Sequence, residues 1–109
     1  MSQLDEKVTM YVKNAEKLGM DLSADLIKKA AADLGPSLYS KDSETVSCGD
    51  ETELETVKDK FLRKKLQLLN SEDELDAAIK KVCEDMGTSN RSKYRAIFYA
   101  QLMKDFGQA

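Results

Sequence analysis

The apolar residues of this chain recur at spacings of three and four positions, in segments separated by glycine. This spacing places apolar side chains on one face of an α-helix, whereas a strand would need alternation. Glycine adopts the left-handed backbone that commonly ends a helix. All five glycines fall where one periodic segment ends or the next begins: Gly19, Gly35, Gly49, Gly87 and Gly107. The sequence therefore predicts helices along nearly the whole chain.

Five helices are predicted from these segments and from residues that cap helix ends. Their predicted starts are Ser2, Asp21 or Ser23, Asp50, Ser71 with Glu74 as a capping box, and Thr88 or Ser89. The second helix should stop at Gly35-Pro36, because proline cannot continue a helix. The segment from about 35 to 50 has no clear period, and we expect one longer loop there.

The last helix is expected to lie at the centre of the fold. Between Ala96 and Met103 only Gln101 is polar, so apolar surface wraps most of the way round this helix. Its aromatic residues are therefore predicted to pack in the core rather than stack on bases. The predicted fold class is all-α: a compact bundle of about five helices with the C-terminal helix central.

Length and composition fit one soluble domain. A chain of 109 residues, 41% hydrophobic and 34% charged, can bury a single core, so residues 1–109 are predicted to form one domain. Its first residues carry charges throughout and no apolar signal region, and no apolar run approaches the roughly 20 residues of a spanning helix. We expect a cytoplasmic protein with no membrane partner.

The chain has no histidine and two cysteines, which removes much of the usual catalytic repertoire. No Cys/His nucleophile pair and no His-containing or four-cysteine zinc site can be built. We predict no enzyme, no metal and no cofactor. Cys48 and Cys83 are expected to be reduced thiols, with a regulatory disulfide as the alternative. Cys83 should be inert packing, whereas Cys48 is a candidate reactive residue near the start of a helix.

Charge is distributed in alternating blocks. Residues 57–69 carry five basic and one acidic residue, whereas residues 70–88 carry two and six. Such blocks indicate that neighbouring helices meet with complementary charge. Arg91 and Arg95 lie four positions apart, and we expect at least one of them to lay its stem on apolar surface and meet a carboxylate. The alternative is a basic patch that binds phosphate, with these candidate residues: Arg63, Lys64, Lys65, Arg91, Lys93 and Arg95.

Three runs carry a resemblance to a known family: "LGPSLYSKDSETVSCGDETELETVKDKFLRKKL", "ELDAAIKKVCEDMG" and "SNRSKYRAIFYAQLMKDF". They resemble a family of short bacterial proteins classed as a domain of unknown function, DUF2853. The resemblance covers almost the whole chain, and it implies one intact domain of bacterial, cytoplasmic origin. It implies no activity, cofactor or catalytic residue.

The expected function is a non-catalytic interaction module that binds another protein or a second copy of itself through a helical face. Met10 and Leu69 are apolar residues off the predicted stripes and are candidates for such a contact. Nucleic-acid binding through the basic patch is the alternative, although an isoelectric point near 5.0 argues against it. Thiol-based redox sensing by Cys48 is a weaker alternative.

Overall fold

The protein is an all-α bundle, described here from a computed structural model that covers residues 3–40, 44–87, 90 and 93–107. Its elements are α1 (Gln3–Lys17), α2 (Ala24–Leu34), the 3₁₀-helix η1 (Gly35–Tyr39), α4 (Glu51–Thr56), the π-helix η2 (Val57–Lys65), α5 (Glu72–Asp85) and α6 (Arg95–Asp105). Across the described ranges, extended pairing is limited to one isolated bridge between Thr45 and Tyr94.

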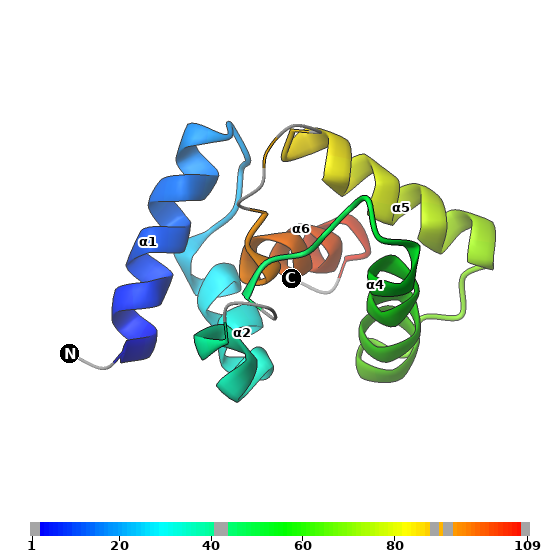
Figure 1. The fold of residues 1–109 in the computed structure, drawn as a ribbon, viewed down its shortest axis with the longest axis horizontal. Helices are drawn as coiled ribbons and strands as arrows, with labels where there is room; N and C mark the ends of the chain where they lie inside the picture. The colour runs from blue at the N-terminus through cyan, green and yellow to red at the C-terminus, as the bar shows by residue number, and fades with distance from the viewer. Residues whose placement is uncertain (1–2, 41–43, 88–89, 91–92, 108–109) are drawn as a thin grey trace.

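Helix α6 lies in the middle of the bundle, as predicted (Figure 1). α1 and α2 lie on one side of it, and α4, η2 and α5 lie on the other. Eight of its eleven residues are buried: Arg95, Ala96, Ile97, Phe98, Tyr99, Ala100, Leu102 and Met103. Because it contacts helices from both sides, α6 contributes to the packing of both halves of the molecule.

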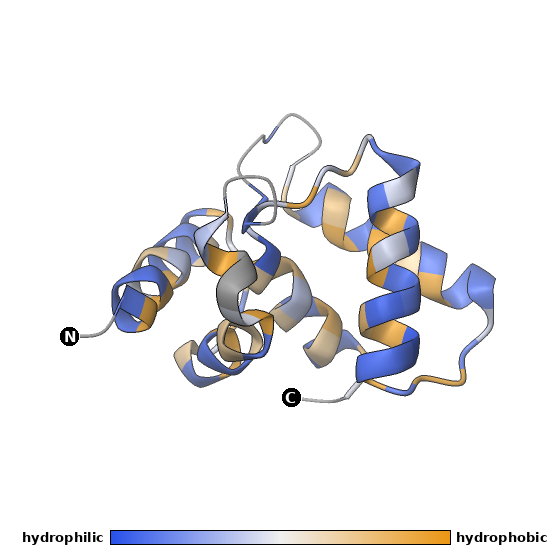
Figure 2. Ribbon diagram, turned by 60° about the horizontal axis from the view of Figure 1, so that its bottom comes forward, coloured by the Kyte–Doolittle hydropathy of each residue, from blue (hydrophilic) through white to orange (hydrophobic). Residues whose placement is uncertain are grey.

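The periodic apolar residues form one core, and hydrophilic residues face outward (Figure 2). The predicted helix starts are confirmed at three positions, where side-chain oxygens accept hydrogen bonds from backbone N–H groups two or three residues on. Ser23 caps α2, Asp50 caps α4 and Ser71 caps α5. Gly87 follows α5 with φ +96°, a conformation that favours glycine. No helix in the described part of the chain is long and apolar enough to cross a membrane.

The third predicted helix changes type partway along, which periodicity did not predict. It begins as α4 and continues as the nine-residue π-helix η2. A π-helix bonds residues five apart, as the Leu66 N–H does to the Phe61 carbonyl at 2.9 Å. Four of its nine residues are buried: Val57, Lys58, Phe61 and Leu62.

The fifth helix begins later than predicted. Thr88 and Ser89, the expected caps, lie outside the described residues, and α6 starts only at Arg95. Tyr94 is extended and bridges to Thr45, and the Val46 N–H donates to the Lys93 carbonyl at 2.8 Å. This short pairing holds residues 93–94 out of the helix and ties the long loop to the start of α6.

Close packing of α2 against its neighbours predicts a sharp difference between two adjacent alanines. Ala31 is fully buried and Ala32 is exposed on the same helix. Ala31→Leu should therefore lower the free energy of unfolding by about 1–3 kcal/mol through overpacking. Ala32→Leu is the matched control and should change it by less than about 0.5 kcal/mol. Urea denaturation measures both, and equal effects would contradict this packing.

Candidate functional site

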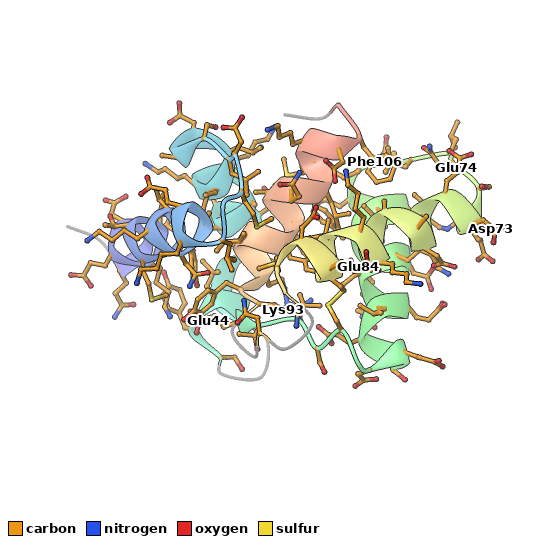
Figure 3. All side chains as sticks on the ribbon, turned by 90° about the horizontal axis from the view of Figure 1, so that it is seen from above. Glu44, Asp73, Glu74, Glu84, Lys93 and Phe106 are labelled. Carbon is orange, nitrogen blue, oxygen red and sulfur yellow. A yellow bond between two sulfur atoms is a disulfide. The ribbon has the colours of Figure 1, made fainter. Side chains whose placement is uncertain are left out.

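The loop between η1 and α4 is fixed to α1 through Glu44. Its carboxylate accepts hydrogen bonds from Lys7 Nζ at 2.5 Å and from the Tyr11 hydroxyl at 2.6 Å. Burial, reinforced by this bond to Glu44, raises the pKa of Tyr11 well above its ordinary value. The Tyr11 ring also lies 5.0 Å from that of Tyr94, centroid to centroid. Glu44 therefore attaches the loop to α1 (Figure 3).

Arg95 joins the same loop to α4 and α6. Its guanidinium donates to the Glu53 carboxylate, to the Thr45 carbonyl at 3.2 Å and to the Tyr99 hydroxyl at 3.1 Å. Only 9% of its side chain is exposed. Burial lowers the pKa of Arg95, but Tyr99 and Glu53 outweigh burial and the net shift is upward. Burial raises the pKa of Tyr99, opposed by Arg95. The predicted contact between an arginine and a carboxylate is confirmed at Arg95.

Cys48 and Cys83 form a disulfide, which corrects the prediction of two reduced thiols. Their Cα atoms lie 6.0 Å apart, and the bond links the residue two before the Asp50 cap to the last turns of α5 (Figure 3). Spacing in the sequence could not reveal the pair, because 35 positions separate the two residues. In this state Cys48 is not a free thiol, and Cys83 is a cross-link rather than inert packing.

A buried lysine links η2 to α5 some distance from the disulfide. The Lys58 ammonium lies 3.0 Å from a Glu55 carboxylate oxygen, 3.1 Å from Asp76 and 3.9 Å from Glu72, and its side chain is only 3% exposed. Hydrogen bonds to Glu55 and then Asp76 raise the pKa of Lys58, although burial opposes them. The basic block 57–69 thus meets the acidic block 70–88, which confirms the predicted complementarity of neighbouring helices.

A cleft of about 540 Å³ opens between α4 and α5, beside the disulfide. We call it the α4–α5 cleft. Its lining is Cys48, Gly49, Glu51, Leu54, Glu55, Asp76, Ile79, Lys80 and Cys83. Leu54 is half-buried and supplies apolar surface, whereas Ile79 is only 2% exposed. Glu51, Glu55 and Asp76 supply three carboxylates, which we call the acidic rim. Lys80 is the single cation among the described lining residues, and Lys58 pairs with Glu55 and Asp76 from outside the lining, so three carboxylates face two cations and the net charge is negative.

The six residues of the predicted basic patch do not share one exposed surface. Lys93 and Arg95 are buried, and Lys93 Nζ donates to the Asn90 carbonyl. Arg91 lies outside the described residues. Arg63 lies 3.7 Å from Glu72 and Lys65 lies 3.7 Å from Asp33, whereas Lys64 is exposed.

Met10 and Leu69 are exposed, as expected for contact candidates. Met10 is 39% exposed on α1, and Leu69 is 99% exposed between η2 and α5. They lie on different elements and do not themselves define one surface. Among the described residues, no group of three or more potential ligands is placed to hold a metal ion.

Sequence reasoning missed two parts of this site. Nothing in the spacing marked Lys58 for burial, because a π-turn follows no period that apolar residues reveal. The α4–α5 cleft was also missed, although its acidic residues were visible as helix-capping charges. The one available signal for this site was the charge pattern, because the basic block 57–69 and the acidic block 70–88 indicate that the two helices face each other.

These features define a small, disulfide-linked helical domain with an acidic cleft. A family model described as "Protein of unknown function (DUF2853)" matches residues 10–109, and the chain belongs to that family. A comparison with curated proteins found no match. The resemblance seen in the sequence is thereby confirmed over nearly the whole chain.

Removal of the Arg95 side chain should destabilise the fold strongly. Arg95→Ala leaves Glu53 and the Thr45 carbonyl without their partner, and we expect a loss of about 3 kcal/mol in the free energy of unfolding. Arg63→Ala breaks a far more exposed ion pair and should cost less than about 1 kcal/mol. Chemical denaturation of both variants tests this, and a mild Arg95→Ala phenotype would show that the buried contacts carry little stability.

Removal of the disulfide should also lower stability. A cross-link between residues 35 positions apart restricts the unfolded chain, and the loop-entropy relation gives about 3–4 kcal/mol. The double variant Cys48→Ala/Cys83→Ala should lose this amount in non-reducing denaturation. Thiol reductant should then shift the denaturation midpoint of the unsubstituted protein but leave that of the double variant unchanged. A loss below about 1 kcal/mol would contradict the expectation.

Proposed function

We propose that this protein is a non-catalytic interaction module of the bacterial cytoplasm that binds a basic, amphipathic segment of another protein in the α4–α5 cleft. The observation that carries the proposal is the composition of the cleft, in which half-buried Leu54 supplies apolar surface beside an acidic rim. Apolar surface supplies affinity, and complementary charge supplies specificity and a faster encounter. A segment with Leu or Ile on one face and Lys or Arg beside it fits both.

The acidic rim is accessible to a partner. Glu51, Glu55 and Asp76 are all exposed, although Glu55 and Asp76 also contact Lys58. Glu51 has no protein ion pair among those found in the described residues, so a cationic partner would not have to displace one there. Binding at an exposed acidic rim should weaken as salt is added, because such charges are screened over about 10 Å at 0.1 M ionic strength.

The nucleic-acid alternative has less support. Two of the six candidate basic residues, Lys93 and Arg95, are buried within this protein, and Arg95 forms an ion pair with Glu53. Lys64 is the exposed member without an ion pair found among the described residues. A second copy of this chain is a further alternative occupant, and both alternatives have distinct outcomes in the test below.

The test uses synthetic helical peptides with identical apolar positions and either lysine or glutamate at the remaining ones. Fluorescence anisotropy at low and high salt should show that the lysine peptides bind and the glutamate peptides do not. Glu51→Lys should weaken binding about tenfold, and Lys80→Glu should strengthen it, since each changes the cleft charge by two units. Asp73→Lys is the matched control, because Asp73 is also an exposed acidic residue in a first helical turn but does not line the cleft (Figure 3).

Three outcomes would contradict the proposal. Equal binding of both peptide types would remove the role of the acidic rim, and equal effects of Glu51→Lys and Asp73→Lys would place the site elsewhere. Binding of a labelled oligonucleotide that is lost at high salt and in Lys64→Ala would favour nucleic acid instead. A concentration-dependent dimer that Glu51→Lys disrupts would identify a second copy as the occupant.

A further inference from the structure

We propose that the Cys48–Cys83 disulfide is a reversible thiol–disulfide exchange site, opened from the α4–α5 cleft by an external thiol that attacks Sγ of Cys48. The substrate class is a small or protein-borne thiol of neutral or positive charge. The exchange reaction stands without the peptide-binding proposal, and only its effect on the cleft's occupant rests on that proposed function.

The two cysteine residues differ in how far they are covered. Cys83 is buried at 7% exposure on the inward face of α5, whereas Cys48 is half-buried at the edge of the core. Both residues line the α4–α5 cleft, a space of about 540 Å³ that opens beside the bond. Exchange rates depend on which sulfur the attacking thiol can reach. This placement makes Cys48 the attacked residue and Cys83 the leaving group.

The reaction proceeds in two balanced exchanges. A thiolate forms a bond to Cys48 Sγ, the bond between the two cysteines breaks, and its electron pair leaves on Cys83 Sγ, which takes a proton from water. A second thiolate attacks the reagent sulfur of the mixed disulfide and releases Cys48 as a thiolate, which is then protonated. Two external thiols are oxidised to one disulfide, and the protein disulfide is reduced to two thiols.

Other contacts hold the loop in place without the disulfide. Glu44 is held by Lys7 and Tyr11, and Val46 is hydrogen-bonded to Lys93 and buried. These contacts hold the loop just before Cys48 when the disulfide is reduced.

Contacts beyond the disulfide also remain. Arg95 holds Glu53 in α4, and Lys58 holds Asp76 in α5. Reduction therefore releases the few residues between Val46 and α4, whereas the end of α5 stays packed in the core through Val82 and Met86. The expected change is a wider cleft in a folded protein, rather than unfolding.

The acidic rim gives the reaction a charge preference. Lys58 pairs with Glu55 and Asp76, but the three carboxylates still outnumber the two cations, Lys58 and Lys80, and Glu51 has no ion pair among those found in the described residues. The local potential is therefore negative. A cationic thiol should be concentrated there and an anionic thiol repelled, and the effect should fade with salt. In the cytoplasm that we propose for this protein, disulfides are uncommon and are usually transient or redox-sensing. A solvent-accessible disulfide is suited to such use.

The first experiment compares cysteamine, 2-mercaptoethanol and mercaptoacetate as reductants of the full-length oxidised protein. Quenching by alkylation and mass spectrometry gives each rate, which is divided by the rate for a small neutral model disulfide to remove intrinsic differences between the thiols. At low salt we expect cysteamine to exceed mercaptoacetate by about three- to tenfold, with convergence at high salt. Glu51→Lys should reduce this ratio, and Asp73→Lys should leave it unchanged.

The same assay distinguishes an exchange site from a purely structural cross-link. For exchange through the cleft, the rate rises in proportion to thiol concentration and is unchanged by urea below the unfolding transition. A rate that saturates with thiol and rises with urea in parallel with global unfolding would overturn the proposal. After oxidation with hydroxyethyl disulfide, the original bond and circular dichroism spectrum should return, and failure to return would exclude reversibility.

Single-cysteine variants test the direction of attack. The Cys48 thiol in Cys83→Ala should react with a maleimide at least about tenfold faster than the Cys83 thiol in Cys48→Ala, because only Cys48 is half-exposed. Denatured samples of both variants should react equally, which controls for the reagent. Equal or reversed rates in the folded proteins would overturn the assignment of Cys48 as the attacked sulfur.

The consequence for binding is measured separately. Reduced protein and the Cys48→Ala/Cys83→Ala variant should both bind the lysine peptides about fivefold or more tightly than oxidised protein, since the opened cleft admits more of the peptide. Unchanged affinity would overturn the coupling while leaving the exchange chemistry intact. Loss of peptide binding in every form, with exchange rates as expected, would instead count against the proposed function alone.

Discussion

The structure depends first on the buried guanidinium of Arg95. A positive charge in the first turn of α6 is unfavourable beside the helix dipole, and burial makes an unpaired charge still more costly. Glu53 from α4, the Thr45 carbonyl and the Tyr99 hydroxyl supply the required partners. Because each comes from a different segment, satisfying one charge fixes the long loop, α4 and the central helix against one another. The Thr45–Tyr94 bridge follows from the same placement.

This arrangement explains why a loop of irregular sequence is ordered where it is described. Glu44 is held by α1, Val46 by the strand-like residues before α6, and Cys48 by α5. The loop therefore connects α1, the residues just before α6 and α5 within five residues, although α1 and α5 lie on opposite sides of α6 (Figure 1). Each attachment uses a different interaction: an ion pair, a backbone hydrogen bond and a covalent bond. Salt weakens the ion pair and thiols break the disulfide, whereas neither acts directly on the backbone hydrogen bond. One attachment can therefore be released while the others remain.

The sequence was sufficient for the fold class and for the expectation that Arg91 or Arg95 meets a carboxylate, because both follow from local rules. Apolar spacing and capping residues such as Ser71 are properties of neighbouring positions, and a cation at a helix start implies a carboxylate. Three features required tertiary information. The Cys48–Cys83 bond depends on how the loop crosses α5, the burial of Lys58 depends on a π-turn, and the late start of α6 depends on pairing with the loop. The cleft combines the first two, which is why the candidate site was less predictable than the fold.

The two helical segments that form the cleft are joined near both ends, and the two joints differ in chemistry. At one end the disulfide links the residues before α4 to the last turns of α5, whereas Lys58 at the start of η2 meets Glu72 and Asp76 near the beginning of α5. At the Lys58 end, a buried ammonium forms ion pairs with several carboxylates, and a reductant does not break these contacts. The disulfide joint is open to the cleft and covalently breakable. Reduction should therefore free the residues before α4 at this end only, while Lys58 holds the other end and Val82 and Met86 keep α5 in the core. Such motion changes the width of the cleft without exposing the core that α6 organises.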